Sequence, residues 1–452
     1  MCAFLIGCHH QIDGANPETV EPPSFETSVA NLQLQTYDYV WERINSTYYD
    51  PDMGGIDWQS AGEELRPLAA NCTTAEELRP IINELLGHLG ESHFGVAPGD
   101  NNALTDSIQN NEPAANESSG LWTNGIDLRM VGDQNGLVRP TVFRVLDDSS
   151  AAMSGVESGW ILQSINGTSV EELTNSVSGE IEGGQSTQSE SDSLSFFVIR
   201  SLNSLVNGDF GETVNLSFLD RSDTQRELSI NPIFREGNSV RLGHLPEVIS
   251  QFRAETLEPS HIGLIQFDIF MGPIIPQITE AIQLFNDEEV NGLVIDIRGN
   301  PGGIAGMATG IVGHLISSRE MSLGEMYDRN SHLDLRVFPR PRSQRFEGPV
   351  ALLVDELSAS TSEFLAAGLQ DLNRGRIFGQ TTAGMALPST IESLPNGDIL
   401  QFVIFNMIRG NGERIEGYGV TPDESAALTR AALISGHDPA LNQAVNWITE
   451  TP

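Results

Sequence analysis

The sequence predicts a multidomain α/β protein, α+β as a whole, with a helical region first, a β-rich module next and an α/β layer last. Apolar residues recur at helical spacing before residue 90, and short strands with turns follow between residues 120 and 232. After residue 262, continuous apolar runs alternate with helical patterns, which is typical of strand and helix units in one layer. At 452 residues the chain exceeds the usual domain length of about 100 to 200 residues, so two or three domains are expected.

The first predicted domain, residues 25–100, is helical and follows a polar, proline-containing lead at residues 1–24. Thr74 and Glu77 have the spacing of a capping box, which marks a helix start. Pro80 opposes a continuous helix there, because it lacks an N–H and lies beyond the first turn. The apolar residues at helical spacing are Leu78, Ile81, Ile82, Leu85, Leu86 and Leu89.

The second predicted domain, residues 120–232, follows a polar linker at residues 101–119 and is expected to consist of short strands and turns. A polar loop is predicted from Glu180 to Asp192. One stretch resembles the PDZ pattern of strand, small-residue helix, strand and turn. Its segments are Val142–Val145, Ser149–Val156, Gly159–Leu162 and Ser164–Gly167. Trp160 departs from this pattern, in which an aspartate is usual.

The third predicted domain, residues 240–452, contains two continuous apolar runs, Gly292–Ile297 and Pro349–Val354. Such runs are typical of parallel strands that are buried on both faces. The first run ends in the glycine-rich turn Arg298–Gly303, and the second leads through Asp355 into a helix. Ligand sites in such layers lie at the carboxyl ends of the strands, so both turns are candidate site segments.

The charge of the chain excludes some partners. A net charge of -38 results from 62 acidic against 24 basic residues, and every base is an arginine, because the sequence contains no lysine. The negative electrostatic potential of such a chain repels nucleic acid and anionic membrane surfaces, so neither is an expected partner. Solubility or a saline habitat is the ordinary explanation of this acidity, and attraction of basic substrates is the alternative.

The three cysteines, Cys2, Cys8 and Cys72, are too few for a disulfide framework. Leu5-Ile6-Gly7-Cys8 resembles the lipobox of bacterial lipoprotein signals, which would place the protein in the periplasm or cell envelope with a lipid anchor at Cys8. The basic and most of the apolar parts of such a signal are missing, so a chance match stays open. No metal-binding spacing and no lysine-containing phosphate loop occurs, so no metal and no cofactor are expected.

Small hydroxyl residues mark the start of the helix after the second apolar run, in the sequence Ser358-Ala359-Ser360-Thr361-Ser362-Glu363. A helix start favours negative charge, which suits an oxyanion. Helix capping is the ordinary alternative for these serines. Gly302 and Gly303 would allow a substrate backbone to approach and an N–H to be aimed at the oxyanion, although a plain turn explains them as well.

A serine nucleophile needs a base, and without lysine this base must be a histidine or a carboxylate. Among nine histidines, His93 lies in a glycine-flanked turn directly after Ser92. A surface or packing role is the ordinary alternative for each of these histidines.

The order of the motifs resembles that of the C-terminal processing, or tail-specific, serine peptidases. The resemblance extends from about residue 25 to residue 445, and its motifs lie at Asp296–Gly303, Ser358–Asp371, Arg376–Gly384 and Gly417–Asp423. It implies a crotonase/ClpP-like ββα catalytic core, an N-terminal helical domain and a PDZ-like domain. The lysine base of the usual members would follow Gly384, where this chain has Met385, so their serine-lysine dyad is excluded.

A second branch, which includes the tricorn core protease, uses a Ser-His-Ser-Glu tetrad. By this resemblance Ser360 is the nucleophile, His93 the base, and Ser92 and Glu416 complete the set. The resemblance places the oxyanion hole at the N–H groups of Thr361 and a glycine, Gly303 before Gly302. Unless the site shifts it, the His93 pKa near 6.5 would make kcat/KM rise with pH through this value.

The implied function is a serine endopeptidase that cleaves unfolded or C-terminally exposed proteins by acyl transfer. PDZ domains capture carboxylates in backbone N–H groups, and the loop from Gly120 to Gly125 is the candidate for this. One alternative is a non-catalytic module that binds peptides or hydrophobic ligands, because the retinoid-binding repeats of the eye resemble this fold. The other is a crotonase-like acyl-CoA enzyme, because the catalytic fold is similar to that one.

Overall fold

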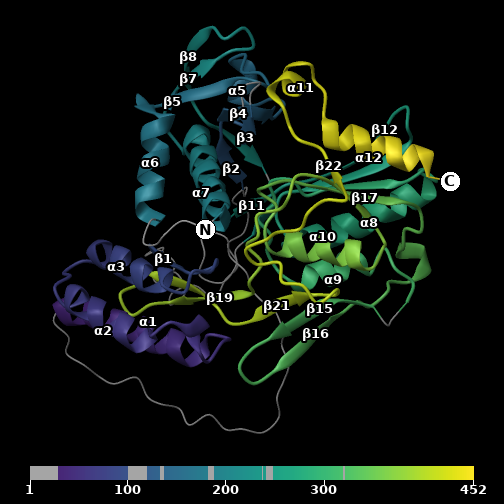
Figure 1. Cartoon of the computed structure of the whole chain (residues 1–452). Coiled ribbons are helices and arrows are strands. Elements are labelled where there is room, and N and C mark those ends of the chain that lie inside the picture. The colour runs from purple at the N-terminus through teal and green to yellow at the C-terminus, as the bar shows by residue number, and fades with distance from the viewer. Residues whose placement is uncertain are drawn as a thin grey trace, which may run out of the picture.

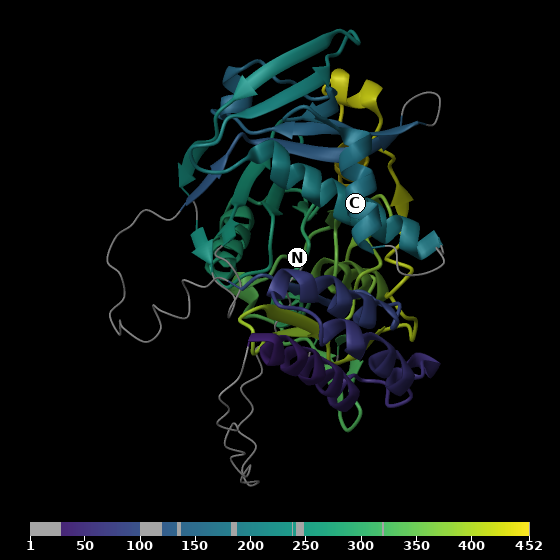
Figure 2. The same cartoon turned by 90° about the vertical axis from the view of Figure 1, so that its left-hand side faces the viewer.

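The computed structural model describes residues 29–99, 120–132, 137–181, 188–236, 238–240, 248–318 and 321–451. The lead with Cys8 and the linker at residues 101–119 lie outside the described residues. Figure 1 shows three groups of elements: helices at lower left, an antiparallel module above them, and an α/β layer to the right. Figure 2 shows the same three groups from the side, with the antiparallel module at the top. The mixed helix and sheet composition confirms the predicted class.

The first group consists of α1 (Val29–Thr47), the 3-10 turn η1 (Met53–Gly55), α2 (Trp58–Ala69) and α3 (Ala75–Gly87). Thr74 and Glu77 form the predicted capping box at the start of α3. Pro80 lies inside α3, so its predicted effect on the helix was wrong. The buried face of α3, with Leu78, Ile82 and Leu85 fully inaccessible, supplies the packing that offsets the lost hydrogen bond.

The antiparallel module has the strand order β3-β4-β5-β7-β8, with β6 beside β5. Its strands are β3 (Ile126–Gly132), β4 (Val138–Val145), β5 (Ile161–Ile165), β6 (Thr168–Ser169), β7 (Val214–Leu219) and β8 (Gln225–Ile230). Its helices are α5 (Ser150–Met153), α6 (Val170–Ile181) and α7 (Gln188–Asn207). Two small ribbons lie beside it, β2 (Gly120–Thr123) with β9 (Ile233–Glu236), and β10 (Asn238–Val240) with β11 (Val248–Ser250).

Two predictions for this module need correction. It was expected to contain strands and turns with one short helix, yet α6 and α7 are long helices, and the predicted loop at Glu180–Asp192 overlaps both. Phe196, Ile199, Leu202 and Val206 of α7 are buried at helical spacing, and this packing outweighs the polar start of the helix. Trp160 is also part of this core, where it packs edge-on against Phe218.

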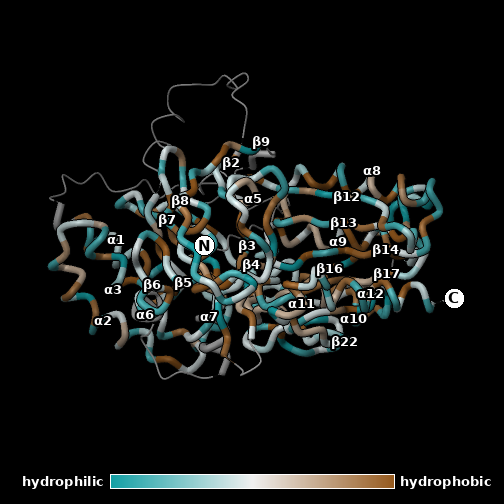
Figure 3. Tube along the Cα trace, turned by 90° about the horizontal axis from the view of Figure 1, so that it is seen from above, coloured by the Kyte–Doolittle hydropathy of each residue, from teal (hydrophilic) through white to brown (hydrophobic). Residues whose placement is uncertain are grey.

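The α/β layer has a six-stranded sheet in the order β12-β13-β14-β17-β18-β22. All neighbours are parallel except β12 and β13. The strands are β12 (Phe252–Leu257), β13 (Ile262–Phe267), β14 (Leu293–Asp296), β17 (Val350–Val354), β18 (Arg376–Gly379) and β22 (Glu424–Ser425). Figure 3 shows hydrophobic residues along β13 and β14. The two continuous apolar runs are therefore central parallel strands, as predicted.

Helices cover both faces of this sheet. One hydrophobic core packs α8 (Ile274–Asp287), α9 (Gly306–Val312) and α10 (Thr361–Asp371) against one face, and α12 (Pro439–Glu450) packs against the other. The faces alternate along β17, because Leu352 belongs to the first core and Leu353 to the second. The short helices η2 (Arg342–Gln344) and α11 (Arg430–Ile434) complete the set of described helices.

Two three-stranded sheets adjoin α10 and the first group of helices. The sheet β16-β15-β21 consists of β16 (His332–Arg336), β15 (Ser322–Tyr327) and β21 (Asn406–Arg409). The other joins β1 (Gly95–Ala97) to the hairpin of β20 (Ile399–Val403) and β19 (Ser389–Ser393). Leu400 and Phe402 of this hairpin lie in the core of α1 to α3. This pairing holds the turn that contains His93 against the C-terminal part of the chain.

Candidate active site

Ser360 lies at the carboxyl end of β17 and directly precedes α10. Its side chain is fully buried, and its backbone has φ 57° and ψ -108°, which L-residues rarely adopt. Within the described part of the chain, its Oγ has no hydrogen-bond partner. A buried hydroxyl without a partner on a strained backbone is typical of a functional residue rather than of a helix cap.

The glycine-rich turn after β14 contacts the start of α10. Thr361 Oγ1 donates a hydrogen bond of 3.0 Å to Gly303 O, and the Ala359 N–H donates to Asn300 O at 3.1 Å. Gly303 has φ 141°, and a Cβ there would lie 2.2 Å from Phe270 O. Only glycine therefore fits at this position. The turn and the helix start form one unit at the edge of the sheet.

The predicted oxyanion residues differ in their hydrogen bonds. The Gly302 N–H donates to Asn300 Oδ1 at 2.8 Å and is therefore engaged within the turn. Thr361 is the first residue of α10, so its N–H has no partner within the helix. Of the three candidates, Thr361 and Gly303 lie in direct contact beside Ser360.

His93 and Ser92 lie in the turn between α3 and β1. Ser92 Oγ is 2.6 Å from His93 Nδ1, and the Ser92 N–H donates to Glu416 Oε1 at 2.9 Å. The His93 side chain is buried and its φ is 64°. Burial lowers the pKa of His93 to about 3, so the imidazole is neutral at pH 7. A neutral imidazole is the form that accepts a proton.

Glu416 connects the Ser92 turn to the segment that follows Gly384. Glu416 Oε2 accepts a hydrogen bond of 2.6 Å from the Ala386 N–H, while Oε1 holds Ser92. Burial raises the pKa of Glu416, and these backbone hydrogen bonds oppose the rise. The structure thus joins Ser92, His93 and Glu416 in one hydrogen-bonded set, although Glu416 lies more than 300 residues later in the sequence.

Glu363 has a position that the sequence did not reveal. It is fully buried, and its Oε2 accepts from the N–H groups of Ser360 and Met385, at 2.8 and 3.0 Å. Its Oε1 accepts from the Gly384 N–H and from Thr382 Oγ1, at 2.8 and 2.6 Å. Burial raises the pKa of Glu363 to about 7, and the charge of Glu416 adds to this rise. The hydrogen bonds from Thr382, Ser360 and Gly384 oppose it.

Residues 384–386 connect the surroundings of Ser360 to the turn that contains Ser92 and His93. Gly384 and Met385 donate to Glu363 beside the nucleophile candidate, and the next residue, Ala386, donates to Glu416 beside the Ser92 turn. Three consecutive N–H groups thus place Ser360 and His93 in one region. One sequence pattern could have singled out Glu363. It lies three residues after a serine at a predicted helix start, which is the spacing of a capping box.

Met385 occupies the position at which the resemblance to C-terminal processing peptidases would place a lysine. Its side chain is buried and belongs to a hydrophobic cluster with Leu357 and Ala359. This apolar packing offers no group that could exchange a proton, which agrees with a base elsewhere.

The predicted substrate-binding residues lie in other elements. Gly120 belongs to β2, where it pairs with Glu236 of β9. Gly125 has φ 78°, and its N–H donates to Thr123 Oγ1 and to Asn207 Oδ1, both at 2.9 Å. Both glycines therefore lie at the antiparallel module, outside the hydrogen-bonded set around Ser360.

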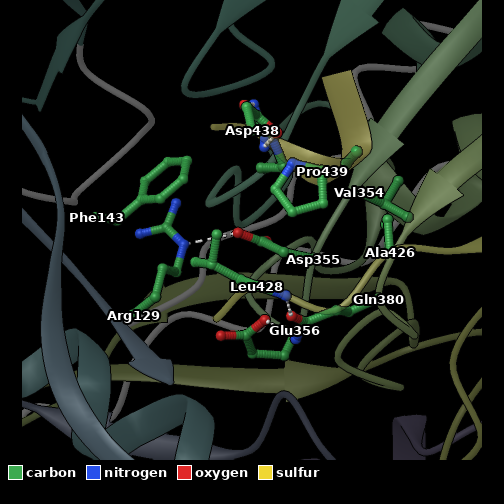
Figure 4. A pocket seen from close by; sticks show the side chains of 13 residues that line it. Arg129, Phe143, Val354, Asp355, Glu356, Gln380, Ala426, Leu428, Asp438 and Pro439 are labelled. Carbon is green, nitrogen blue, oxygen red and sulfur yellow. Dashed lines mark hydrogen bonds and ion pairs between the residues drawn. The ribbon is translucent and has the colours of Figure 1, made fainter. Parts of the chain in front are cut away.

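A buried ion pair joins this module to the site turns (Figure 4). Arg129 Nε of β3 donates to Asp355 Oδ2 at 2.6 Å, and both side chains are at least 90% buried. Asp355 Oδ1 in turn accepts from the N–H groups of Gly299 and Leu357, at 2.8 and 3.1 Å. The guanidinium of Arg129 also lies 4.9 Å from the ring centre of Phe143, which favours a cation over the ring. Through Asp355, Arg129 thus helps to hold the two turns next to Ser360, those of Gly299 and Leu357.

Within the described ranges, no group of three or more histidine, cysteine, aspartate or glutamate side chains could hold a metal ion. None of the helices in the described part of the chain is long and apolar enough to cross a membrane.

Two family models match the chain. The model described as Peptidase family S41 matches residues 261–426, which include Ser360, Glu363 and Glu416. Residues 261–426 are thus similar to peptidase family S41. The model described as Tricorn protease C1 domain matches residues 33–87 and ends shortly before Ser92 and His93.

Curated relatives of this chain include tricorn protease homolog 2 of Streptomyces coelicolor, which is 25% identical over 92% of the chain and 32% of its own length. The carboxyl-terminal-processing peptidase 2, chloroplastic, of Arabidopsis thaliana is 26% identical over 90% of the chain and 70% of its own length. The chain spans only about a third of the tricorn homolog and of CtpA of Bacillus subtilis, of which it covers 36%.

Solved structures share the fold of this chain. The photosystem II D1 C-terminal processing protease has a TM-score of 0.56 at 17% identity, covering 93% of this chain and 98% of that one. Mature CPAF has a TM-score of 0.60 at 14% identity, covering 93% and 97%. The tricorn protease has a TM-score of 0.51 at 19% identity, covering 94% and 37%.

Proposed function

We propose that this chain is a serine-type endopeptidase that cleaves peptide bonds of proteins through an acyl-enzyme on Ser360. The observation that carries the proposal is the hydrogen-bonded set of Ser92, His93 and Glu416, which residues 384–386 join to the start of α10. The match of residues 261–426 to the S41 model supports the same chemistry, because this region contains Ser360.

In the proposed mechanism, His93 Nε2 removes the Ser360 proton as Oγ attacks the peptide carbonyl. We assign this role to Nε2 because Nδ1 is engaged by Ser92. The N–H groups of Thr361 and Gly303 stabilise the oxyanion, with Gly302 shaping the turn. His93 then protonates the leaving amine, water enters, and the same residue assists hydrolysis of the acyl-enzyme.

Ser92 and Glu416 orient the imidazole in this mechanism. Glu416 fixes the Ser92 backbone, and the Ser92 hydroxyl contacts Nδ1. With Ser92 between it and the ring, the carboxylate of Glu416 stabilises the imidazolium that forms after proton transfer. It does so without direct contact between the carboxylate and the ring. Burial, in contrast, keeps the imidazole neutral in the resting enzyme.

The proposed substrates are proteins that are unfolded or expose a C-terminus. Two relatives carry names that refer to carboxyl-terminal processing, which supports this class. Ser360 is fully buried, so a substrate must enter by displacing part of its surroundings. An extended, unfolded segment meets this requirement more easily than a folded surface does.

Hydrolysis of a fluorescently labelled, denatured protein tests the proposal. Ser360→Ala and His93→Ala are each expected to lower the rate by about 10³-fold or more, as removal of a nucleophile or its base does. Ser176→Ala and His437→Ala, at exposed positions, are the matched controls and should keep full activity. Unchanged hydrolysis in Ser360→Ala would favour the alternative, a ligand-binding module of the same fold.

For location, we propose export to the periplasm or cell envelope with a lipid on Cys8. The lipobox-like Leu5-Ile6-Gly7-Cys8 supports this, although it lies outside the described residues. Metabolic labelling with a fatty-acid analogue in a bacterial host should mark the wild type and not Cys8→Ala. Equal labelling of both proteins, or labelling of neither, would contradict the anchor.

A further inference from the structure

The outer strand of the antiparallel module is capped by two asparagines of α7. The strand β3 pairs with β4 on one side, and α7 lies along the other (Figure 1), where only the last residue of β3, Gly132, forms an isolated bridge, with Thr429, among the described residues. Asn203 Oδ1 accepts from the Leu128 N–H at 2.7 Å, and its Nδ2 donates to Leu128 O at 3.1 Å. Asn207 makes the same pair of bonds with Ile126, at 3.0 and 2.8 Å.

The spacing of these side chains matches that of a neighbouring strand. Four helix residues rise about 6 Å, and two strand residues span about 6.6 Å, so side chains at positions i and i+4 reach alternate strand residues. A side-chain amide offers the same donors and acceptor as a peptide group. Asn203 and Asn207 thus imitate the hydrogen bonds that an added peptide strand would make with β3.

At the N-terminal end of β3, several hydrogen-bond donors point to one oxygen atom, as they do in anion-binding sites. Asn207 Oδ1 accepts from the N–H groups of Gly125 and Ile126 and from Thr123 Oγ1, at 2.9, 3.0 and 2.7 Å. An amide oxygen has two lone pairs, whereas a carboxylate offers about four acceptor sites. The three converging donors therefore suit a carboxylate better than the neutral oxygen that they hold.

We propose that Asn203 and Asn207 are a built-in competitor for a peptide with a free C-terminal carboxylate. Such a peptide would add to β3 as a strand and place its carboxylate on the N–H groups of Gly125 and Ile126. The asparagines must leave first, so the apparent affinity is lowered by the fraction of molecules in which the edge is open. The carboxylate would lie at the loop that the resemblance to PDZ domains already indicated, and the proposal adds that the two asparagines compete for this site.

Fluorescence anisotropy in a Ser360→Ala background tests this proposal without cleavage. The probe is a labelled ten-residue peptide that ends in an apolar residue with a free carboxylate. The double variant Asn203→Ala with Asn207→Ala should bind it at least tenfold more tightly than the parent. The same peptide with a C-terminal amide should gain much less. Asn442→Ala is the control and should not change the affinity, because the side-chain amide of Asn442 in α12 contacts His437, outside the antiparallel module.

Equal or weaker binding in the folded double variant, or an equal gain for the amide peptide, overturns the proposal. If thermal unfolding shows that the double variant does not fold, the single variant Asn203→Ala is tested in its place. This variant keeps the hydrogen bonds of Asn207 with Gly125 and Ile126. A folded Asn203→Ala protein should bind about threefold more tightly, and no gain overturns the proposal. If the wild type does not hydrolyse proteins, the proposed peptidase function is wrong. The binding measurement does not depend on hydrolysis and still decides the present proposal.

Discussion

At the scale of single residues, Ser360 and His93 share a strained backbone. Both have a positive φ, of 57° and 64°, although neither is glycine. Such conformations cost on the order of 1 to 3 kcal/mol and persist where the surrounding structure enforces them. The hydrogen bond from the Ser360 N–H to Glu363 is one such constraint.

Substitution of Ser360 separates this strain from catalysis. Ser360→Gly and Ser360→Ala should both abolish hydrolysis, because both remove the hydroxyl. Ser360→Gly should nevertheless unfold with a free energy about 1 kcal/mol higher than that of Ser360→Ala, since glycine accepts a positive φ without steric cost. Urea unfolding of both variants measures the difference. A more stable alanine variant would show that the backbone at Ser360 is relaxed.

Burial of His93 predicts a pH effect on stability. In the unfolded chain its pKa is about 6.5, whereas burial lowers it to about 3 in the folded protein. Between these values the unfolded state binds the extra proton, so stability falls as pH falls. The free energy of unfolding of the wild type, relative to His93→Gln, should drop by about 1.4 kcal/mol per pH unit from roughly pH 6 to pH 4. A difference that stays constant over this range, or that grows, would contradict a buried neutral imidazole.

At the scale of elements, residues 384–386 and the start of α10 form one assembly through Glu363. Each carboxylate oxygen of Glu363 receives two donors, so an amide in its place would turn its NH₂ group toward two donors in either orientation. The assembly therefore requires an acceptor-only side chain, and Glu363 acts as a positioning residue.

Replacement of Glu363 tests this assembly. Glu363→Gln is expected to lower kcat by about 10- to 100-fold with little change in KM, because the nucleophile and its backbone shift while the substrate contacts elsewhere remain. Glu413→Gln, at an exposed position of the same region, is the matched control. Steady-state kinetics on a peptide substrate measures both constants. A rise in KM without loss of kcat would place Glu363 in substrate binding instead.

Local patterns made some of these elements predictable from the sequence. The capping box of Thr74 and Glu77 and the apolar runs at β14 and β17 depend on neighbouring residues, so the sequence predicted them. The helix α7 was missed because its polar start hides the apolar spacing of Phe196, Ile199 and Val206. The roles of Glu363 and of Asn207 depend on partners from separate segments, which sequence spacing does not bring together.

At the scale of the whole molecule, charged side chains join its three parts. Arg129 ties the antiparallel module to Asp355. Arg414 and Glu91 form an ion pair, and Tyr48 and Tyr49 of the first helical group also donate to Glu91, at 2.5 and 2.7 Å. Glu91 directly precedes Ser92, so this contact holds the turn of the proposed base against the segment of Glu416.

The Arg129 contact makes a prediction about stability. Arg129→Met should destabilise the protein by about 3 to 5 kcal/mol, because it leaves Asp355 buried without a cation. Arg336→Met, an exposed arginine that pairs with Asp334, should cost less than about 1 kcal/mol. Denaturant unfolding of both variants compares the two costs. Similar small losses for both would show that the module is only loosely attached.

The proposed mechanism requires that folding brings His93 to Ser360 as its base. Mass spectrometry after reaction with a small fluorophosphonate probe tests this requirement. We expect a single adduct on Ser360 in the wild type, none in Ser360→Ala, and labelling of Ser360 at least 100-fold slower in His93→Ala. An adduct on another residue, or an unchanged rate of labelling in His93→Ala, would contradict it.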